Sequence, residues 1–203
     1  MKQIVFFGNI GAGKTTCGEL IDKRYKNVQF IEEDVSENPF LPMFYNDMKK
    51  WGFHSSISML ALMSSYYEKI DKSKEIVILD QGVEELIAYT WLECDLGILS
   101  LEEYATYKKI YNNICNLLPE VTLYVYFKCE LSEELRRIKE RGRKFEQSID
   151  YEFIYKLSLK YEEFVKSLPQ DKVIVLDTTN GYDLLEFIQK IEEKINIKFT
   201  AAE

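Results

Sequence analysis

The sequence predicts an α/β fold in which a parallel sheet of about five strands is flanked by helices. Short runs of β-branched and aromatic residues recur along the chain, and segments with helical spacing of apolar residues separate them. The first of these runs leads directly into a glycine-rich turn. No internal repeat or low-complexity linker divides the 203 residues, so we expect a single domain over residues 1–203.

The expected strands and helices alternate along the chain. Strands are predicted at 4–7, 28–31, 76–80, 121–127 and 173–176. Helices are predicted from the glycine turn to about residue 25, from 52 to about 70, and at 83–94, 101–117, 151–167 and 182–195. A further helix is expected to be capped by Ser132-Glu133-Glu134, and residues 38–50, with two prolines, open a mostly helical region.

The glycine-rich turn has the motif of a phosphate-binding loop, and the strand before it and the helix after it complete the context that this motif requires. Its glycines let successive backbone N–H groups converge on phosphate oxygens, and the helix adds the positive end of its dipole. Lys14 supplies a charge for the β- and γ-phosphates, and the Thr15 hydroxyl can bind Mg²⁺. We therefore expect a nucleoside triphosphate to bind Gly8, Asn9, Ile10, Gly11, Ala12, Gly13, Lys14, Thr15 and Thr16.

Composition narrows the class of partner. The net charge of −8, from 26 basic and 34 acidic side chains, argues against a nucleic-acid duplex, whose binding depends on neutralising phosphates. The four cysteines are widely spaced and form no CxxC pair, which favours reduced thiols in a cytoplasmic protein. We expect no signal peptide, because the first predicted strand begins within four residues of Met1, and no apolar stretch approaches membrane-spanning length. Small phosphorylated ligands remain the expected partners.

Two acidic residues stand where predicted strands end. Glu33 follows the second strand and Asp80 closes the third, and loops at the carboxyl ends of parallel strands carry the ligand sites of open α/β sheets. Either carboxylate can accept a proton from an acceptor hydroxyl or hold Mg²⁺ through water. Both positions are equally compatible with simple helix capping.

A run of arginines follows the fourth predicted strand. Arg137 and Arg141 share one helix face, and Gly142 lets the chain turn so that Arg143 can join them. Three guanidinium groups near a phosphate-binding loop can hold phosphate oxygens in bidentate pairs. The alternative is a solvated basic face whose charges pair with Glu133, Glu134, Glu140 and Glu146.

Taken together, these segments resemble the deoxynucleoside kinase family, especially its bacterial purine branch, the deoxyguanosine and deoxyadenosine kinases. The resemblance covers nearly the whole chain, and RGRKFEQ at 141–147 is far more specific than the phosphate loop. It implies a P-loop kinase fold with an Arg-rich lid over about residues 137–148, and a homodimer. The segments that carry it are GNIGAGKTT (8–16), ENPFLPMFYNDMKKWGF (37–53), YKKIYNNICNLLP (107–119), RIKERGRKFEQSIDYEFI (137–154) and VIVLDTTN (173–180).

The resemblance also implies an activity and roles for single residues. The expected reaction is ATP-dependent phosphorylation of a deoxynucleoside 5′-hydroxyl, with a purine favoured. Glu33 matches the general base, and Tyr45 and Glu146 match the pair that binds the sugar 3′-hydroxyl. The arginines match lid residues over the transferred phosphate: Arg137, Arg141 and Arg143. The loop from Asp177 to Tyr182, including Thr179, matches the segment that lies against the donor base.

Several positions depart from the family pattern. Gln81 stands where most members have an arginine after the acidic end of the third strand, and Ser56 stands where a base-recognising glutamine is common. Met63 and Leu86 occupy positions where an arginine and an acid are expected, with Glu84 and Glu85 as possible substitutes for the acid. Removing base-recognising groups lowers or redirects selectivity. The residues expected to bind the substrate are Glu33, Tyr45, Ser56, Asp80, Gln81 and Glu146.

The same residues leave other activities open. A nucleoside monophosphate kinase needs a second basic site, and Gln81 in place of arginine argues against it. A non-catalytic nucleotide-binding regulator is supported only by the missing base-recognising residues. A GTPase is disfavoured, because no Asn-Lys-x-Asp segment follows the fourth or fifth strand. For the kinase, the expected metal-binding residues are Thr15, Glu33 and Asp80, and the expected catalytic residues are Glu33, Lys14, Arg137 and Arg141.

Overall fold

The computed structural model describes residues 1–142 and 151–202. Its sheet has the strand order β2-β3-β1-β4-β5, and every neighbouring pair is parallel. The predicted parallel sheet is therefore confirmed. Its strands are β1 (Lys2–Gly8), β2 (Val28–Ile31), β3 (Ile76–Asp80), β4 (Leu123–Lys128) and β5 (Val173–Asp177).

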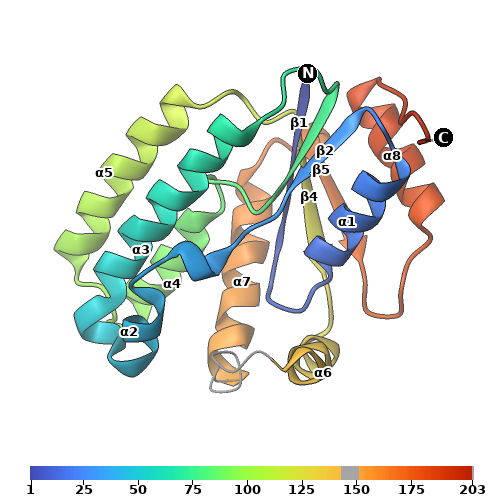
Figure 1. Ribbon diagram of the computed structural model, residues 1–203. Helices are drawn as coiled ribbons and strands as arrows, with labels where there is room; N and C mark the ends of the chain where they lie inside the picture. Colours follow the sequence, from blue (N-terminus) through green and yellow to red (C-terminus); the bar gives the residue numbers. More distant parts are fainter. Residues whose placement is uncertain (143–150, 203) are drawn as a thin grey trace.

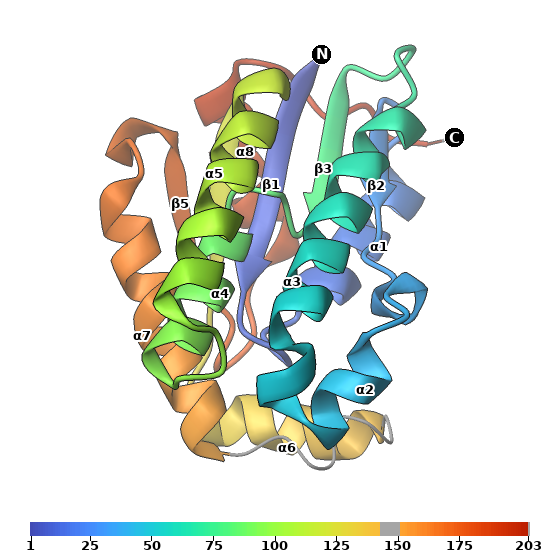
Figure 2. The same cartoon turned by 90° about the vertical axis from the view of Figure 1, so that its left-hand side faces the viewer.

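Helices cover both faces of this sheet (Figures 1 and 2). One face carries α3 (Met48–Ser65), α4 (Leu86–Asp95), α5 (Leu101–Leu117) and α7 (Tyr151–Ser167). The other carries α1 (Lys14–Arg24) and α8 (Leu184–Ile195). Two further helices, α2 (Leu41–Asn46) and α6 (Leu131–Arg141), and short 3-10 turns at 35–37, 66–69 and 170–172 complete the described elements.

The central strands contain unbroken apolar runs because both of their faces are covered. Successive side chains of a strand point to opposite faces. Val5 and Phe7 of β1 accordingly pack in the layer of α3, α4, α5 and α7, whereas Ile4 and Phe6 pack against α1 and α8. All four side chains are fully buried. The unbroken run of apolar residues that predicts a strand is thus the consequence of two cores, one on each side.

Some element boundaries differ from the predicted ones. The helix expected to be capped by Ser132-Glu133-Glu134 begins at Leu131 instead, with Glu130 at its N-cap. The backbone N–H groups of Glu133 and Glu134 donate to the Glu130 carbonyl over 3.0 Å each, so these residues already belong to the first helical turn. The helix predicted from 83 begins at Leu86, and the one predicted from 52 begins at Met48.

All five strands point their carboxyl ends toward the same edge of the sheet. At this edge the loop between β1 and α1 meets the segments that follow β2 and β3, and α6 lies across it (Figure 1). Ligand sites of open α/β sheets form here. In the two described stretches of chain, no helix combines the length and the apolar character needed to span a membrane.

Candidate active site

The loop from Gly8 to Lys14 adopts a backbone that only glycine tolerates at several positions. Gly8, Gly11 and Gly13 have φ angles of 136°, 83° and 95°. A Cβ at Gly8 would lie 2.5 Å from the Phe127 carbonyl oxygen, and one at Gly11 would lie 2.8 Å from the carbonyl oxygen of Glu134. These contacts exclude any side chain, because the opposing atoms are backbone. The loop and the start of α1 both contribute residues to the lining of a cavity.

Lys14 and Asn9 hold this loop from within. Lys14 Nζ donates to the carbonyls of Gly8 and Asn9 over 2.9 and 3.1 Å, so its ammonium group already lies across the phosphate-binding turn. Asn9 Nδ2 donates to Glu134 Oε2 and to the Ile154 carbonyl over 2.9 and 3.0 Å, which ties the loop to α6 and α7. Burial raises the pKa of Glu134 to about 7.

Thr15 and Asp80 meet directly beneath the loop. The Thr15 hydroxyl donates to Asp80 Oδ2, and Asp80 is buried at the end of β3. Hard oxygen ligands of this kind suit Mg²⁺, which keeps several waters and takes further ligands from substrate phosphates. Among the residues that the structure describes, no group of three or more His, Cys, Asp or Glu side chains is arranged to hold a metal ion. Thr15 and Asp80 therefore fit a magnesium ion that takes most of its other ligands from a bound nucleotide and water.

Glu33 and Gln81 form the next part of the site. In the amide orientation that pairs donors with acceptors, Gln81 Nε2 donates to both carboxylate oxygens of Glu33, over 2.8 and 3.0 Å. Gln81 has a φ angle of 66°, unusual for a residue with a side chain, and its backbone N–H donates to the Phe6 carbonyl. Backbone strain of this kind is concentrated at functional sites. The strained turn aims the amide at Glu33.

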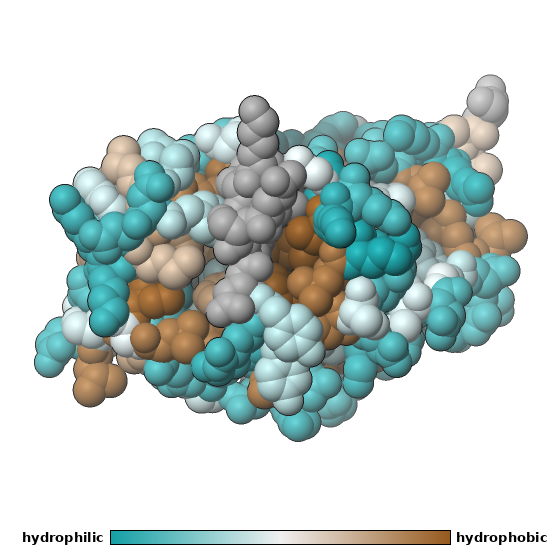
Figure 3. Space-filling view, turned by 90° about the horizontal axis from the view of Figure 1, so that it is seen from below, coloured by the Kyte–Doolittle hydropathy of each residue, from teal (hydrophilic) through white to brown (hydrophobic). Residues whose placement is uncertain are grey.

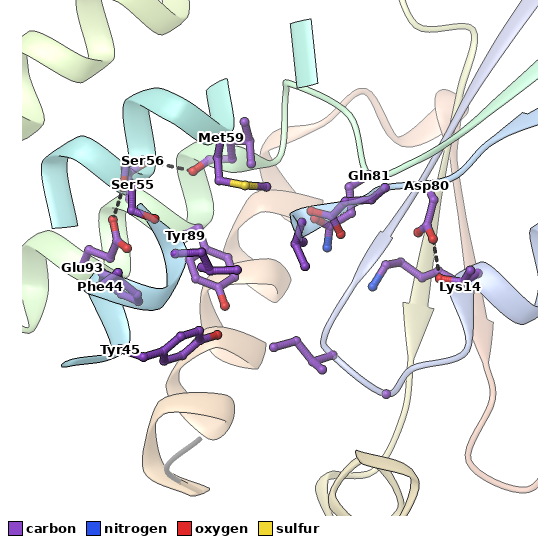
Figure 4. Close-up of a pocket in the computed structure, with 18 of the residues that line it drawn as sticks. Lys14, Phe44, Tyr45, Ser55, Ser56, Met59, Asp80, Gln81, Tyr89 and Glu93 are labelled. Carbon is purple, nitrogen blue, oxygen red and sulfur yellow. Dashed lines mark hydrogen bonds between the residues drawn. The ribbon is translucent and has the colours of Figure 1, made fainter. Parts of the chain in front are cut away.

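These groups line one cavity of about 370 Å³, a volume suited to a small molecule such as a nucleoside. The phosphate loop, Asp80 and Gln81 form one end, and residues of α2, α3 and α4 form the other (Figure 4). The face at the carboxyl ends of the strands shows apolar surface within a hydrophilic surround (Figure 3). The predicted residues that line the cavity are Ile10, Gly11, Gly13, Lys14, Thr15, Thr16, Glu33, Tyr45, Ser56, Asp80, Gln81, Arg137 and Arg141.

Arg137 turns toward the phosphate loop. Its guanidinium group donates to the Thr178 carbonyl over 2.6 Å, to the Gly11 carbonyl over 3.3 Å and to Glu133 Oε1 over 2.7 Å. Arg136, by contrast, pairs with Glu133 and Glu140 on the exposed face of α6. The helix therefore carries both a solvated basic face and an arginine directed at the site. Arg143 and Glu146 lie outside the described residues.

Some of the predicted donor-side residues do not line this cavity. Gly8, Asn9 and Ala12 form the buried part of the loop. Thr179 Oγ1 accepts a hydrogen bond from the Glu130 N–H, and the ring of Tyr182 packs 6.0 Å from that of Phe187. Thr178, which the sequence did not single out, donates from its hydroxyl to the Ala12 carbonyl over 2.8 Å. It thereby joins the end of β5 to the phosphate loop.

The far end of the cavity contains a group that the sequence analysis missed. Glu93 of α4 is 3% exposed, and the Ser56 hydroxyl of α3 donates to its Oε2 over 2.5 Å. Burial raises the pKa of Glu93 to about 8. The spacing of Leu86, Thr90 and Glu93, which places them on one helix face, is the signal that could have revealed it, since all three line the cavity.

The residues considered as substitutes for the expected base-recognising groups lie elsewhere. Glu85 is buried and Glu84 is half-buried, both outside the cavity lining, and burial raises the pKa of both carboxyls. Met63 is 1% exposed and packs in the core between α3 and the sheet. Other members of the lining that the sequence did not indicate are Val35, Leu41, Phe44, Ser55, Met59, Tyr89, Thr90 and Tyr107.

A phosphate-binding loop, a carboxylate beside it and an enclosed cavity at the carboxyl edge of a parallel sheet define a P-loop phosphotransferase acting on a small molecule. The comparison with known families agrees with this class. The chain belongs to the deoxynucleoside kinase family, whose model matches residues 4–200. The predicted family, fold and phosphotransferase activity are therefore confirmed.

Relatives of known function cover most of this chain. It is 32% identical over 192 residues to the deoxyguanosine kinase of Bacillus subtilis, a match of 91% of this chain and 88% of that one. It is 26% identical over 196 residues to the deoxyadenosine/deoxycytidine kinase of the same organism, covering 95% and 89%. The solved structure of deoxyadenosine kinase from M. mycoides with bound dATP has a TM-score of 0.78, 32% identity and coverage of 96% and 100%.

Proposed function

We propose that this protein transfers the γ-phosphate of ATP to the 5′-hydroxyl of a deoxynucleoside, with a purine favoured. The observation that carries the proposal is the single cavity that joins the phosphate loop to Glu33 and continues to a compartment lined by α2, α3 and α4. A nucleoside whose 5′-hydroxyl lies at Glu33 has its base in that compartment and its reacting oxygen near the phosphate loop.

In the proposed mechanism Glu33 accepts the proton of the 5′-hydroxyl as the oxygen attacks the γ-phosphorus in line. Gln81 orients the Glu33 carboxylate. Lys14, Arg137 and Arg141 stabilise the charge that develops on the transferred phosphoryl group. Thr15 and Asp80 would hold Mg²⁺, which when bound neutralises charge on the β- and γ-phosphates.

Further roles extend this proposal. Tyr45 lines the cavity and is assigned to the sugar, together with Glu146. Arg143 is assigned to a lid over about residues 137–148 of a single domain, 1–203. Thr179 and Tyr182 are assigned to the donor base, beyond the cavity. Each role is tested by the effect of an alanine substitution on the KM for nucleoside against the KM for ATP.

The distribution of charge favours a nucleoside over a nucleoside monophosphate as acceptor. Among the described residues that line the cavity, the cationic ones are Lys14, Arg137 and Arg141, which belong to the phosphate loop and to α6. The α2, α3 and α4 end contributes no cationic side chain to the described lining. A second phosphate bound there would lack the counter-charge that its desolvation requires.

A homodimer in the cytoplasm completes the proposal. The four cysteines carry free thiols, which supports a reducing compartment. The dimer is proposed from family resemblance, and light scattering coupled to size-exclusion chromatography tests it. A monomeric mass at micromolar concentration contradicts the dimer but leaves the proposed reaction unaffected.

The deciding experiment is a turnover screen with purified protein and Mg·ATP. The four natural deoxynucleosides and their 5′-monophosphates are supplied separately, with K14A as the inactive control. We expect a deoxynucleoside to be phosphorylated and expect no turnover without Mg²⁺. Turnover of a monophosphate alone contradicts the proposed acceptor. Absence of turnover with every acceptor, while ATP still binds, indicates a non-catalytic regulator.

A further inference from the structure

The end of the cavity farthest from the phosphate loop contains a buried acid that forms no ion pair with any residue the structure describes. We infer that Glu93, oriented by Ser56, is the residue that hydrogen-bonds the base, and that its protonation state sets the choice between guanine and adenine. The inference rests on the proposed function, because it assumes that a nucleoside occupies the cavity. Glu93 is not one of the positions at which the sequence analysis found a departure from the family pattern.

The position of Glu93 follows from the geometry of the cavity. Lys14 and Gln81 lie at the phosphate-loop end of the cavity, whereas Ser56 and Glu93 lie at the opposite end (Figure 4). Glu33 accompanies Gln81 through the hydrogen bonds between their side chains. Apolar side chains line this end as well, namely Leu41, Phe44, Met59 and Leu86. They form an environment for a flat ring but offer it no hydrogen bond. Glu93 is therefore placed to meet the polar edge of a base.

One oxygen of the Glu93 carboxyl is engaged and the other is available. Oε2 accepts the hydrogen bond from the Ser56 hydroxyl, and Oε1 has no hydrogen-bond partner among the described residues. Glu93 lines the cavity, so a ligand bound there can supply a hydrogen-bond partner for Oε1. The carboxyl group is thus held in one orientation with a free position directed to a ligand.

The groups around Glu93 keep it neutral. Burial is the main cause that raises its pKa to about 8, and the Ser56 hydrogen bond opposes the shift. The titratable groups near it on other elements are Tyr45 of α2 and Tyr107 of α5, and the pKa of Tyr107 is itself raised by burial. Lys160 of α7 is paired with Asp95 and so provides no counter-charge for Glu93.

The two protonation states recognise different base edges. A protonated carboxyl offers one donor and one acceptor, whereas a carboxylate only accepts. Adenine presents an acceptor nitrogen beside an amine, which the protonated carboxyl complements, and guanine can pair with it through its carbonyl oxygen and ring N–H. The carboxylate instead complements the two adjacent donors of guanine, its ring N–H and its amine. Ionisation of Glu93 therefore disfavours adenine and retains guanine.

The test is calorimetric binding of deoxyadenosine and deoxyguanosine between pH 6.5 and 9, with turnover measured separately. For the wild type we expect deoxyadenosine affinity to fall about tenfold from pH 7 to 9, as the neutral fraction falls above a pKa of about 8. Deoxyguanosine affinity should hold or rise. E93Q, whose amide keeps a donor and an acceptor, should bind deoxyadenosine with no such pH dependence.

Two variants and one control complete the design. E93A should bind both nucleosides about tenfold more weakly, as expected for the loss of one buried hydrogen bond. S56A should reduce the difference in affinity between the two nucleosides, because the Glu93 carboxyl is then free to rotate. E84Q removes a half-buried acid outside the cavity lining and should bind both nucleosides as the wild type does. If E93A does not fold, the pH profile of E93Q against wild type still decides the question.

The outcomes separate this inference from the proposed reaction. Identical pH profiles for wild type and E93Q, or unchanged binding by E93A, overturn the role of Glu93. Base-selective binding that depends on Glu93 but is not followed by turnover supports the inference and overturns the proposed reaction. Failure of both nucleosides to bind the wild type overturns both.

Discussion

The Gln81 amide donates to both carboxylate oxygens of Glu33, over 2.8 and 3.0 Å. This neutral contact stands where most of the family was expected to have an arginine. Because the Gln81 backbone is held at a φ of 66° and its N–H donates to Phe6, the amide is fixed by the end of β3. The contact therefore holds in one orientation the carboxylate that is proposed to accept the proton.

Replacing Glu33 by Gln tests the general base. The amide preserves shape but cannot accept a proton, so we expect kcat to fall by about 10²–10⁴ while ATP and nucleoside binding stay nearly unchanged. Steady-state kinetics and calorimetry measure the two effects, and E32Q, an exposed neighbour, serves as the control. Wild-type turnover by E33Q contradicts the assignment.

Substitutions at Gln81 separate orientation from backbone strain. Q81G and Q81A both remove the amide, so both should lower kcat, by about tenfold for the loss of one orienting contact. Only glycine adopts a positive φ without steric cost. The free energy of unfolding of Q81G should therefore be about 1 kcal/mol higher than that of Q81A. Chemical denaturation measures this difference. Equal stabilities would show that the φ of 66° carries no strain.

Glycine substitutions test the close approach of the phosphate loop to α6. Gly11 and Gly97 both have positive φ angles, of 83° and 65°, but a Cβ at Gly97 meets no atom within 4 Å. The free energy of unfolding of G97A should be lower than that of the wild type by only ~1 kcal/mol, the cost of placing alanine in a left-handed backbone conformation. G11A should lose more stability, because its Cβ would clash with the Glu134 carbonyl oxygen. The same clash should displace the phosphate loop and weaken ATP binding. Thermal unfolding and ATP titration measure both effects, and equal losses in the two variants would exclude a role for the contact.

Stability should depend on pH through Glu93. Burial raises its pKa from 4.5 to about 8, so between these values the folded protein holds a proton that the unfolded chain has released. Rising pH therefore lowers the free energy of unfolding across this window, by at most ~1.4 kcal/mol per pH unit for one group. E93Q removes this dependence, and its stability relative to wild type should rise from pH 5 to pH 8. Urea unfolding measures the trend, and parallel profiles would contradict it.

The fold and the catalytic end of the site could be predicted because their signals are local. Each central strand contains a continuous apolar run, since helices cover both of its faces. The phosphate loop, Glu33 and Asp80 lie within or directly after strands, and parallel strands carry such residues to one edge. Arg137 was also predicted, although only the structure decides between a site role and a solvated face, by directing it at the Thr178 carbonyl.

What the sequence by itself determined is therefore the order of strands and helices, the phosphate loop and the residues at strand ends. Tertiary structure decided the base-recognition end. Ser56 and Glu93 are 37 residues apart and meet only because α3 packs beside α4. Thr178 meets Ala12 across 166 residues because the sheet places β5 two strands from β1. Such contacts depend on how the strands are ordered and how the helices pack against them, and neither spacing nor propensity along the chain encodes that geometry.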